Sequence, residues 1–248
     1  MLEAESTTAV PALAMLKQTG LLPNPPSQAK ILDIACGSGV VAKCLFENMA
    51  TSEPDFEVLC GDLDQTMVNM TSDSIMEKGW KNVTVDRIDA HATGFTDGEF
   101  SHVLMNFGPQ LMNDAEKTLK ETHRILRSGG VMGTTCWVKA GWIPSVMATF
   151  PNFKPPGLLK TDTWKEPDSI KGVLRGIGFE DVRVEEHAFV TRPGVGNVDG
   201  FLELMGLLMP ALLNGENAGK YGRYMRDQVQ EGGAEMSWMA LIVSARKP

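Results

Sequence analysis

A glycine-rich turn followed by an acid is the part of the sequence best suited to bind a ligand. Gly37, Ser38 and Gly39 begin a G-x-G-x-x-A pattern that ends at Ala42. Glycines let the backbone turn sharply and approach a ligand closely, and a helix starting there offers free N–H groups to an electron-rich group. Asp62 stands 23 residues beyond Gly39, where an acid can accept hydrogen bonds from a ribose diol. This combination indicates a site for a nucleoside-containing ligand.

A second carboxylate, Asp33, indicates the charge of that ligand. Asp33 lies in the apolar run that leads into the turn, four residues before Gly37. Beside the pyrophosphate of a dinucleotide, a carboxylate would cost about 1 kcal/mol or more in a partly buried site. A cationic ligand reverses the sign of this interaction. Asp33 therefore disfavours NAD and favours S-adenosylmethionine, which carries a sulfonium and an ammonium group and no phosphate.

Alternating strands and helices are expected to position these residues. Short apolar or alternating runs predict strands from residue 30 to the glycine turn and at residues 56–60, 82–89, 100–107, 131–138, 182–190 and 238–248. Helical periodicity predicts helices at residues 7–22, 39–49, 66–78, 114–126, 168–179 and 201–213. This alternation is typical of βαβ units and a parallel sheet. Residues 139–165, rich in Pro, Gly and Trp, are expected to form an irregular insertion.

Composition narrows the class of protein further. The length of 248 residues fits one α/β domain, and a net charge of −8 disfavours nucleic acid and anionic membranes as partners. No C-x-x-C pair indicates zinc, so no metal is expected. Free cysteines in core segments suit the cytoplasm, and the first ten residues do not resemble a secretory signal. The longest apolar stretch, residues 201–213, is too short to span a bilayer.

Four segments resemble the motifs of the class I S-adenosylmethionine-dependent methyltransferases. ILDIACGSGVVA resembles motif I, and FEVLCGDLDQTMV resembles the second-strand motif whose acid holds the ribose. IDAHATGFTDGEFSHVLMNF resembles the third and fourth motifs, and LKETHRILRSGGVMGTTCW the segment leading into the fifth strand. The resemblance runs from Lys30 to Trp137 in the family's order and spacing, and is nearest to small enzymes like those of ubiquinone and menaquinone pathways. Ser101 and Ser128 depart from the usual Asp and Pro.

The resemblance implies a fold and a division of the chain. The fold would be a Rossmann-like, doubly wound α/β sheet of seven strands, mostly parallel, with an antiparallel C-terminal hairpin. The single domain, residues 1–248, would comprise an N-terminal helical lid at 1–28 and a cofactor-binding core at 29–138. Residues 139–248 would supply substrate-covering insertions and the C-terminal strands.

The resemblance also implies a set of residues that bind S-adenosylmethionine. Asp89 and Ala90 match positions that contact the adenine, and Met67 is either a further adenine contact or ordinary core packing. Asn106 and Phe107 either contact the methionine moiety or the substrate, or only form a turn. The full predicted set is Asp33, Ala35, Gly37, Ser38, Gly39, Asp62, Leu63, Met67, Asp89, Ala90, Asn106 and Phe107.

Substrate-binding residues are expected in apolar segments outside the motifs. The predicted set is Leu13, Trp137, Trp142, Met205 and Met209, with core packing as the alternative for each. Aromatic faces suit flat organic substrates and stabilise cations. No catalytic residue is assigned; among the histidines, His91 is the best-placed candidate base, because it directly follows Asp89 and Ala90.

The sequence thus predicts methyl transfer to an O, N, S or C atom of a small, largely apolar metabolite. One alternative is a related protein that binds the cofactor but catalyses a rearrangement or cyclisation; another is an NAD-dependent oxidoreductase. The substrate, the methylated atom and the oligomeric state stay open.

Overall fold

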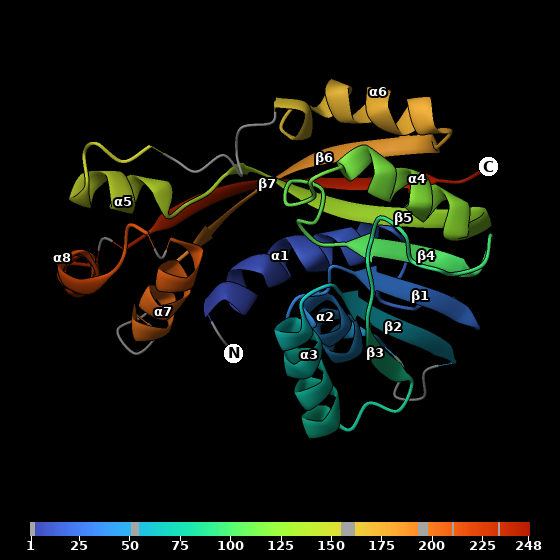
Figure 1. Cartoon of the computed structure of the whole chain (residues 1–248), viewed down its shortest axis with the longest axis horizontal. Helices are drawn as coiled ribbons and strands as arrows, with labels where there is room; N and C mark the ends of the chain where they lie inside the picture. The colour runs from blue at the N-terminus through green and yellow to red at the C-terminus, as the bar shows by residue number, and fades with distance from the viewer. Residues whose placement is uncertain (1–2, 51–54, 155–161, 193–197, 210, 233) are drawn as a thin grey trace.

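A single seven-stranded sheet with helices on both faces forms the framework of the protein (Figure 1). The computed structural model describes residues 3–50, 55–154, 162–192, 198–209, 211–232 and 234–248. The strand order is β3-β2-β1-β4-β5-β7-β6. The strands are β1 (Ala29–Ile34), β2 (Phe56–Asp62), β3 (Val83–Arg87), β4 (Phe100–Met105), β5 (Leu126–Lys139), β6 (Glu180–Thr191) and β7 (Met236–Arg246). β7 runs antiparallel to β5 and β6, and the other pairings are parallel. The predicted fold class is confirmed.

The order of the strands explains where a ligand can bind. From β1 the chain builds outward through β2 to β3, and then returns to place β4 on the other side of β1. Asp33 of β1 therefore lies between Cys60 of β2 and Leu104 of β4. Connections diverge from this point, and open α/β sheets bind ligands beyond the carboxyl ends of their strands at such a point.

The helices bury one apolar side each against the two faces of the sheet. α1 (Glu3–Gln18), α2 (Val40–Asn48) and α3 (Gln65–Lys78) cover one face, and α4 (Ala115–Ile125) and α6 (Pro167–Ile177) cover the other (Figure 1). Leu45 of α2 and Leu119 of α4 are each 1% exposed within these two cores. In the described part of the chain, no helix has the length and apolar character needed to cross a membrane.

α1 is anchored to the sheet through its C-terminal half. Met15 and Leu16 are fully buried, and the Gln18 side chain donates to Ser244 Oγ at 3.1 Å. Gly133 of β5 allows this close packing, since a Cβ there would lie 2.6 Å from Thr19 Cγ2. Within the segment predicted as a lid, the C-terminal half of α1 is thus part of the core. The covering role remains a prediction for the N-terminal half.

Beyond α1, a separate group of apolar side chains forms at one end of the sheet. α5 (Ile143–Thr149), α7 (Val198–Leu208) and α8 (Gly215–Gln230) surround the outer ends of β5, β6 and β7 (Figure 1). We call their shared core the outer cluster; it comprises Ala140, Trp142, Val146, Val198, Phe201, Met205, Met209, Leu213, Tyr221, Met225, Met236 and Trp238. The prediction that residues 139–165 are irregular is wrong for α5, which gains its helix by burying Val146 in this cluster.

Candidate cofactor and active site

The glycine turn between β1 and α2 has the backbone conformation that its sequence predicts. Gly37 and Gly39 have φ values of 56° and 82°, in the left-handed region that glycine adopts without strain. Ala35 also lies there, at 55°. A Cβ on Gly39 would meet the Thr71 side chain at 3.2 Å, whereas a Cβ on Gly37 would meet no other atom within 4 Å. The space beside Gly37 is therefore open on the side where a ligand can approach.

Alanine substitutions at Gly37 and Gly39 are expected to differ in their effects on stability and cofactor affinity. Gly39→Ala is expected to lower both thermal stability and cofactor affinity, because it combines a strained φ with a contact to α3. Gly37→Ala carries only the strain, about 1 kcal/mol, yet places a methyl group in the open space. We expect its affinity for S-adenosylhomocysteine, measured by calorimetry, to fall at least as far as that of Gly39→Ala, with the smaller loss in melting temperature. The opposite ranking of stabilities would contradict this assignment.

Asp62 ties the glycine turn to the carboxyl end of β2. Its Oδ2 accepts from the Gly37 backbone N–H at 2.9 Å, and its Oδ1 accepts from the Asp64 N–H at 3.0 Å. The Thr71 hydroxyl donates to the Gly37 carbonyl oxygen at 2.8 Å from α3. An ionised carboxylate has about four lone-pair positions, so Asp62 can brace the turn and still accept from a ribose diol.

Asp33 is a buried carboxyl group without a hydrogen-bond partner. It is 1% exposed, and neither oxygen has a partner among the described residues. Burial, and secondarily the charge of Asp62, raise the pKa of Asp33 well above its usual value. An unpaired buried carboxyl is costly to the folded protein, and Asp33 precedes the first glycine of the turn by four residues. A cationic ligand at the turn would supply the missing partner, so the site fits S-adenosylmethionine.

The segment after β3 places Asp89, Ala90 and His91 together. Asp89 Oδ1 accepts from the His91 backbone N–H at 2.9 Å and lies 3.0 Å from His91 Nδ1. These two hydrogen bonds lower the pKa of Asp89. Nε2 of His91 is buried and has no partner among the described residues. The imidazole is thus held by the residue predicted to contact the adenine, and its role as a base remains a prediction.

Two apolar side chains lie near the ends of β2 and α3. Leu63, directly after Asp62, is 55% exposed, and its carbonyl oxygen accepts from Arg87 Nε at 2.9 Å. Met67, in the first turn of α3, is half-buried. An exposed leucine is suited to cover a flat apolar ring such as adenine, since removing its apolar surface from water would gain free energy.

The loop after β4 is held in an unusual conformation by β5. Phe107 has a φ of 62°, and its backbone N–H donates to Thr135 Oγ1 at 2.9 Å. The Thr135 hydroxyl in turn donates to Asn106 Oδ1 at 2.7 Å. The Asn106 amide also donates to the Thr8 carbonyl oxygen of α1 at 3.2 Å. Tertiary contacts therefore fix both Asn106 and Phe107, and their contact with the cofactor or substrate remains a prediction.

An aromatic stack joins this loop to β5. The rings of Phe107 and Trp137 lie parallel, with centroids 3.9 Å apart and an angle of 6°. The Gln110 side chain accepts from the Trp137 backbone N–H and donates to its carbonyl oxygen. Trp137 also lies 5.1 Å from Trp238, between ring centroids, at the border of the outer cluster. Thr135 and Gln110 were not among the predicted residues, since their role depends on pairing between distant strands and loops.

The other predicted substrate-binding residues divide between two places. Trp142, Met205 and Met209 are brought together in the outer cluster, where they are 9%, 0% and 6% exposed. Leu13 is half-buried and packs against the core between α1 and the sheet. In this structure these four side chains pack as core residues. Trp137 is the predicted residue that connects the outer cluster with the loop after β4.

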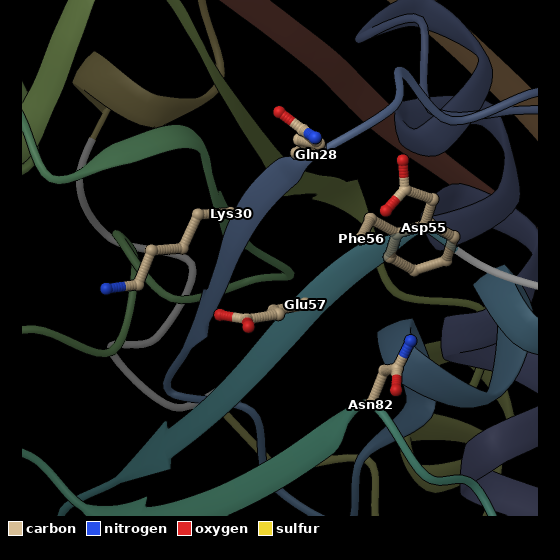
Figure 2. Close-up of a pocket in the computed structure, with 7 residues that line it drawn as sticks. Gln28, Lys30, Asp55, Phe56, Glu57 and Asn82 are labelled. Carbon is tan, nitrogen blue, oxygen red and sulfur yellow. The ribbon is translucent and has the colours of Figure 1, made fainter.

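Two cavities lie away from the glycine turn. Figure 2 shows the first, of about 360 Å³, at the amino ends of β1, β2 and β3, with Lys30, Glu57 and Asn82 among its lining residues. Because these strands are parallel, this cavity is at the opposite edge of the sheet from Asp33 and Asp62. The second, of about 420 Å³, lies between α5, α8 and the start of β7. Neither includes a residue of the predicted cofactor site.

The fold and the site together define a class I methyltransferase architecture, and comparisons with known proteins agree. Residues 31–130 match the family described as "Methyltransferase domain". The chain is 26% identical to Methyltransferase tpcH of Aspergillus fumigatus over 260 residues, which cover 96% of this chain and 91% of that protein.

Solved structures of low sequence identity share the fold. The [4+2]-cyclase SpnF has a TM-score of 0.59 at 19% identity, covering 99% of this chain and 81% of that chain. Phosphoethanolamine N-methyltransferase 2 of Haemonchus contortus, in complex with S-adenosyl-L-methionine, also has 0.59, at 18% identity, covering 96% and 52%. These findings indicate an S-adenosylmethionine-dependent methyltransferase, and the family match spans residues 31–130.

Proposed function

We propose that the acceptor is a small, largely apolar organic metabolite, methylated on an O, N, S or C atom beside the Phe107–Trp137 stack. The observation that carries this proposal is the stack itself, which two separate sets of hydrogen bonds fix at the carboxyl end of β4. Flat aromatic faces favour apolar and planar ligands. Binding would gain about 25 cal/mol for each Å² of apolar surface removed from water, before the costs of ordering.

The cofactor would be held by carboxylates from three neighbouring strand ends. Asp33 would neutralise the ammonium group, directly or through water, and Asp62 would accept from the ribose hydroxyls. Asp89 would accept from the adenine amino group, with Leu63, Met67 and Ala90 as apolar neighbours. The remaining contacts would come from Ala35, Gly37, Ser38, Gly39, Asn106 and Phe107. When bound, S-adenosylmethionine supplies an electrophilic methyl group on its sulfonium.

The protein's own contribution to the reaction would be alignment and exclusion of water. Holding a nucleophile in line at about 3 Å contributes several kcal/mol to catalysis. Hydrogen bonds hold the backbone on both sides of the Phe107–Trp137 stack, so it suits this positioning. A base is needed only for a hydroxyl group or a protonated amine. His91 would serve there only through Nε2, because Asp89 holds Nδ1.

The location and partners of the protein are part of this proposal. All four cysteines are buried outside any disulfide, which supports a reducing compartment such as the cytoplasm. The net charge of −8 disfavours nucleic acid as a partner. The chain division into lid, cofactor core and substrate-covering segments, and the quinone-like subgroup, also remain proposals.

A product assay tests the proposed activity against its alternative. The purified protein and S-adenosylmethionine would be incubated with a panel of small phenols, thiols, amines and activated carbon acids. Methyl transfer predicts S-adenosylhomocysteine and a product heavier than the substrate by one methylene group. A cyclisation or rearrangement would give a product with the mass of the substrate and no S-adenosylhomocysteine. Turnover only of highly charged or macromolecular substrates would contradict the proposed apolar acceptor.

Trp137→Ala tests the residue on which the substrate site depends. We expect a roughly tenfold loss in kcat/KM, the size typical of lost positioning, with S-adenosylmethionine affinity nearly unchanged. Trp80→Ala is a matched control, because Trp80 is also half-buried and stacks on Phe46 at 5.0 Å, and it precedes the amino end of β3 rather than following a carboxyl end. Both variants should lose thermal stability. If their kinetic constants fall equally, or if Trp137→Ala loses cofactor binding, Trp137 is structural.

A further inference from the structure

We propose that Thr135 is a positioning residue of the methyl-transfer site, acting through Asn106 and Phe107. The side chain is 0% exposed and lies on β5, and Thr135 is not among the residues predicted to bind the cofactor or the substrate. The inference rests on the proposed function, because only that function makes this loop part of a methyl-transfer site. The observations that support the role of Thr135 are hydrogen bonds within the chain, which do not depend on the proposed function.

One hydroxyl group serves both residues of the loop after β4. Thr135 Oγ1 accepts from the Phe107 N–H at 2.9 Å and donates to Asn106 Oδ1 at 2.7 Å. Phe107 has a φ of 62°, a conformation that costs free energy for any residue with a Cβ. It persists only where its surroundings hold it. The buried hydrogen bond from Phe107 to Thr135 supplies such a constraint.

The position of Thr135 follows from where the sheet ends. Parallel pairing between β4 and β5 stops at Met105 and Thr134, so the backbone beyond Met105 has no ladder partner on β5. Beyond the last ladder pair, the Thr135 side chain makes the next hydrogen bonds between β5 and this loop. The Asn106 amide then donates to the Thr8 carbonyl oxygen of α1. Through this chain of bonds, β5 and α1 together set the position of Phe107.

The Phe107–Trp137 stack depends on two independent supports. Thr135 fixes the Phe107 backbone, and the Gln110 side chain fixes the Trp137 backbone. Loss of the Thr135 hydroxyl would free only the Phe107 side of the stack. The expected defect is therefore a misplaced ring beside the reacting methyl group, while β5 and the Trp137 backbone stay in place.

Thr134 provides a matched control at the neighbouring position. It is 1% exposed, and its hydroxyl donates to the Met105 carbonyl oxygen at 2.7 Å. Thr134→Val removes a buried hydroxyl bond from β5 to the end of β4, and Thr135→Val removes one from β5 to the loop that follows β4. It leaves the contacts of Asn106 and Phe107 intact. The two variants should lose similar thermal stability. A difference between them in affinity or kcat/KM therefore reflects which residues each hydroxyl contacts.

The experiment compares Thr135→Val, Thr135→Ser and Thr134→Val by three measurements. Amide hydrogen exchange at Phe107 should rise roughly tenfold in Thr135→Val only, since its acceptor is lost. Affinity for S-adenosylhomocysteine, by calorimetry, and kcat/KM should each fall roughly tenfold in the same variant. Thr135→Ser, which keeps the hydroxyl, should restore all three values to near those of the unmodified protein.

Each alternative result has a defined meaning. If Phe107 stays protected in Thr135→Val, or if both valine variants lose affinity and kcat/KM equally, the inference is overturned. If the unmodified protein binds S-adenosylhomocysteine but methylates no acceptor, the proposed acceptor class fails instead. In that case the exchange and affinity measurements still decide the role of Thr135, because neither needs turnover.

Discussion

Asp33→Asn is expected to weaken the binding of both S-adenosylmethionine and S-adenosylhomocysteine by roughly 2 kcal/mol, while raising the stability of the ligand-free protein. The affinity falls because the amide keeps the shape of the side chain and removes the charge that pairs with the ammonium group common to both ligands. The stability rises because a buried acid without a partner is replaced by a neutral group. Calorimetry and thermal unfolding measure the two effects.

The pH dependence of stability follows from the raised pKa of Asp33, which burial causes first and the charge of Asp62 second. A carboxyl group whose pKa is higher in the folded protein holds its proton more tightly there. Its contribution to stability is present at pH values below the unfolded pKa of about 3.9, and is lost as the pH rises through the folded pKa. In Asp33→Asn, this decline in stability with rising pH should be absent.

Ligand binding should also release a proton from Asp33. A bound cation favours the ionised carboxylate and so lowers the raised pKa of Asp33. Affinity should then increase with pH, and the measured binding enthalpy should depend on the ionisation enthalpy of the buffer. Asp73→Asn, on an exposed position of α3, is a control that should change neither. Normal affinity of Asp33→Asn for both ligands, together with binding of NAD, would indicate an oxidoreductase instead.

Asp62→Ala is expected to reduce S-adenosylmethionine affinity by at least roughly 2 kcal/mol, about thirtyfold. Two effects combine: the ribose loses its acceptor, and the backbone N–H groups of Gly37 and Asp64 lose theirs. Asp62→Asn keeps one acceptor oxygen and should give an intermediate affinity. Calorimetry with purified, folded variants measures each value.

Asp64→Ala separates the ligand contact from local helix stability. Asp64 is the N-cap of α3, and its Oδ1 accepts from the Thr66 N–H at 2.7 Å. Its removal should lower thermal stability slightly and leave cofactor affinity unchanged. A folded Asp62→Ala protein that binds as tightly as Asp64→Ala would show that Asp62 only braces the turn.

The sequence by itself determined the parts of this protein that depend on local pattern. The apolar runs and helical periods predicted the seven strands, and chirality and connection rules then limit how such βαβ units assemble. The left-handed conformations of Gly37 and Gly39 follow from residue type. Asp33 and Asp62 were placed by their spacing from that turn, because a strand end and the following turn are contiguous in the chain.

Only the tertiary structure decided which residues fix the loop after β4 and which apolar residues lie together. Asn106 bonds to Thr8 across 98 positions, and Phe107 bonds to Thr135 across 28. These pairs depend on strand register and on where β4 ends, neither of which is encoded by a local period. α8 was not predicted, because its buried face is limited to Tyr221, Gly222 and Met225. The same long-range packing places Trp142, Met205 and Met209 in the outer cluster, since burial is set by which surfaces meet after the chain has folded.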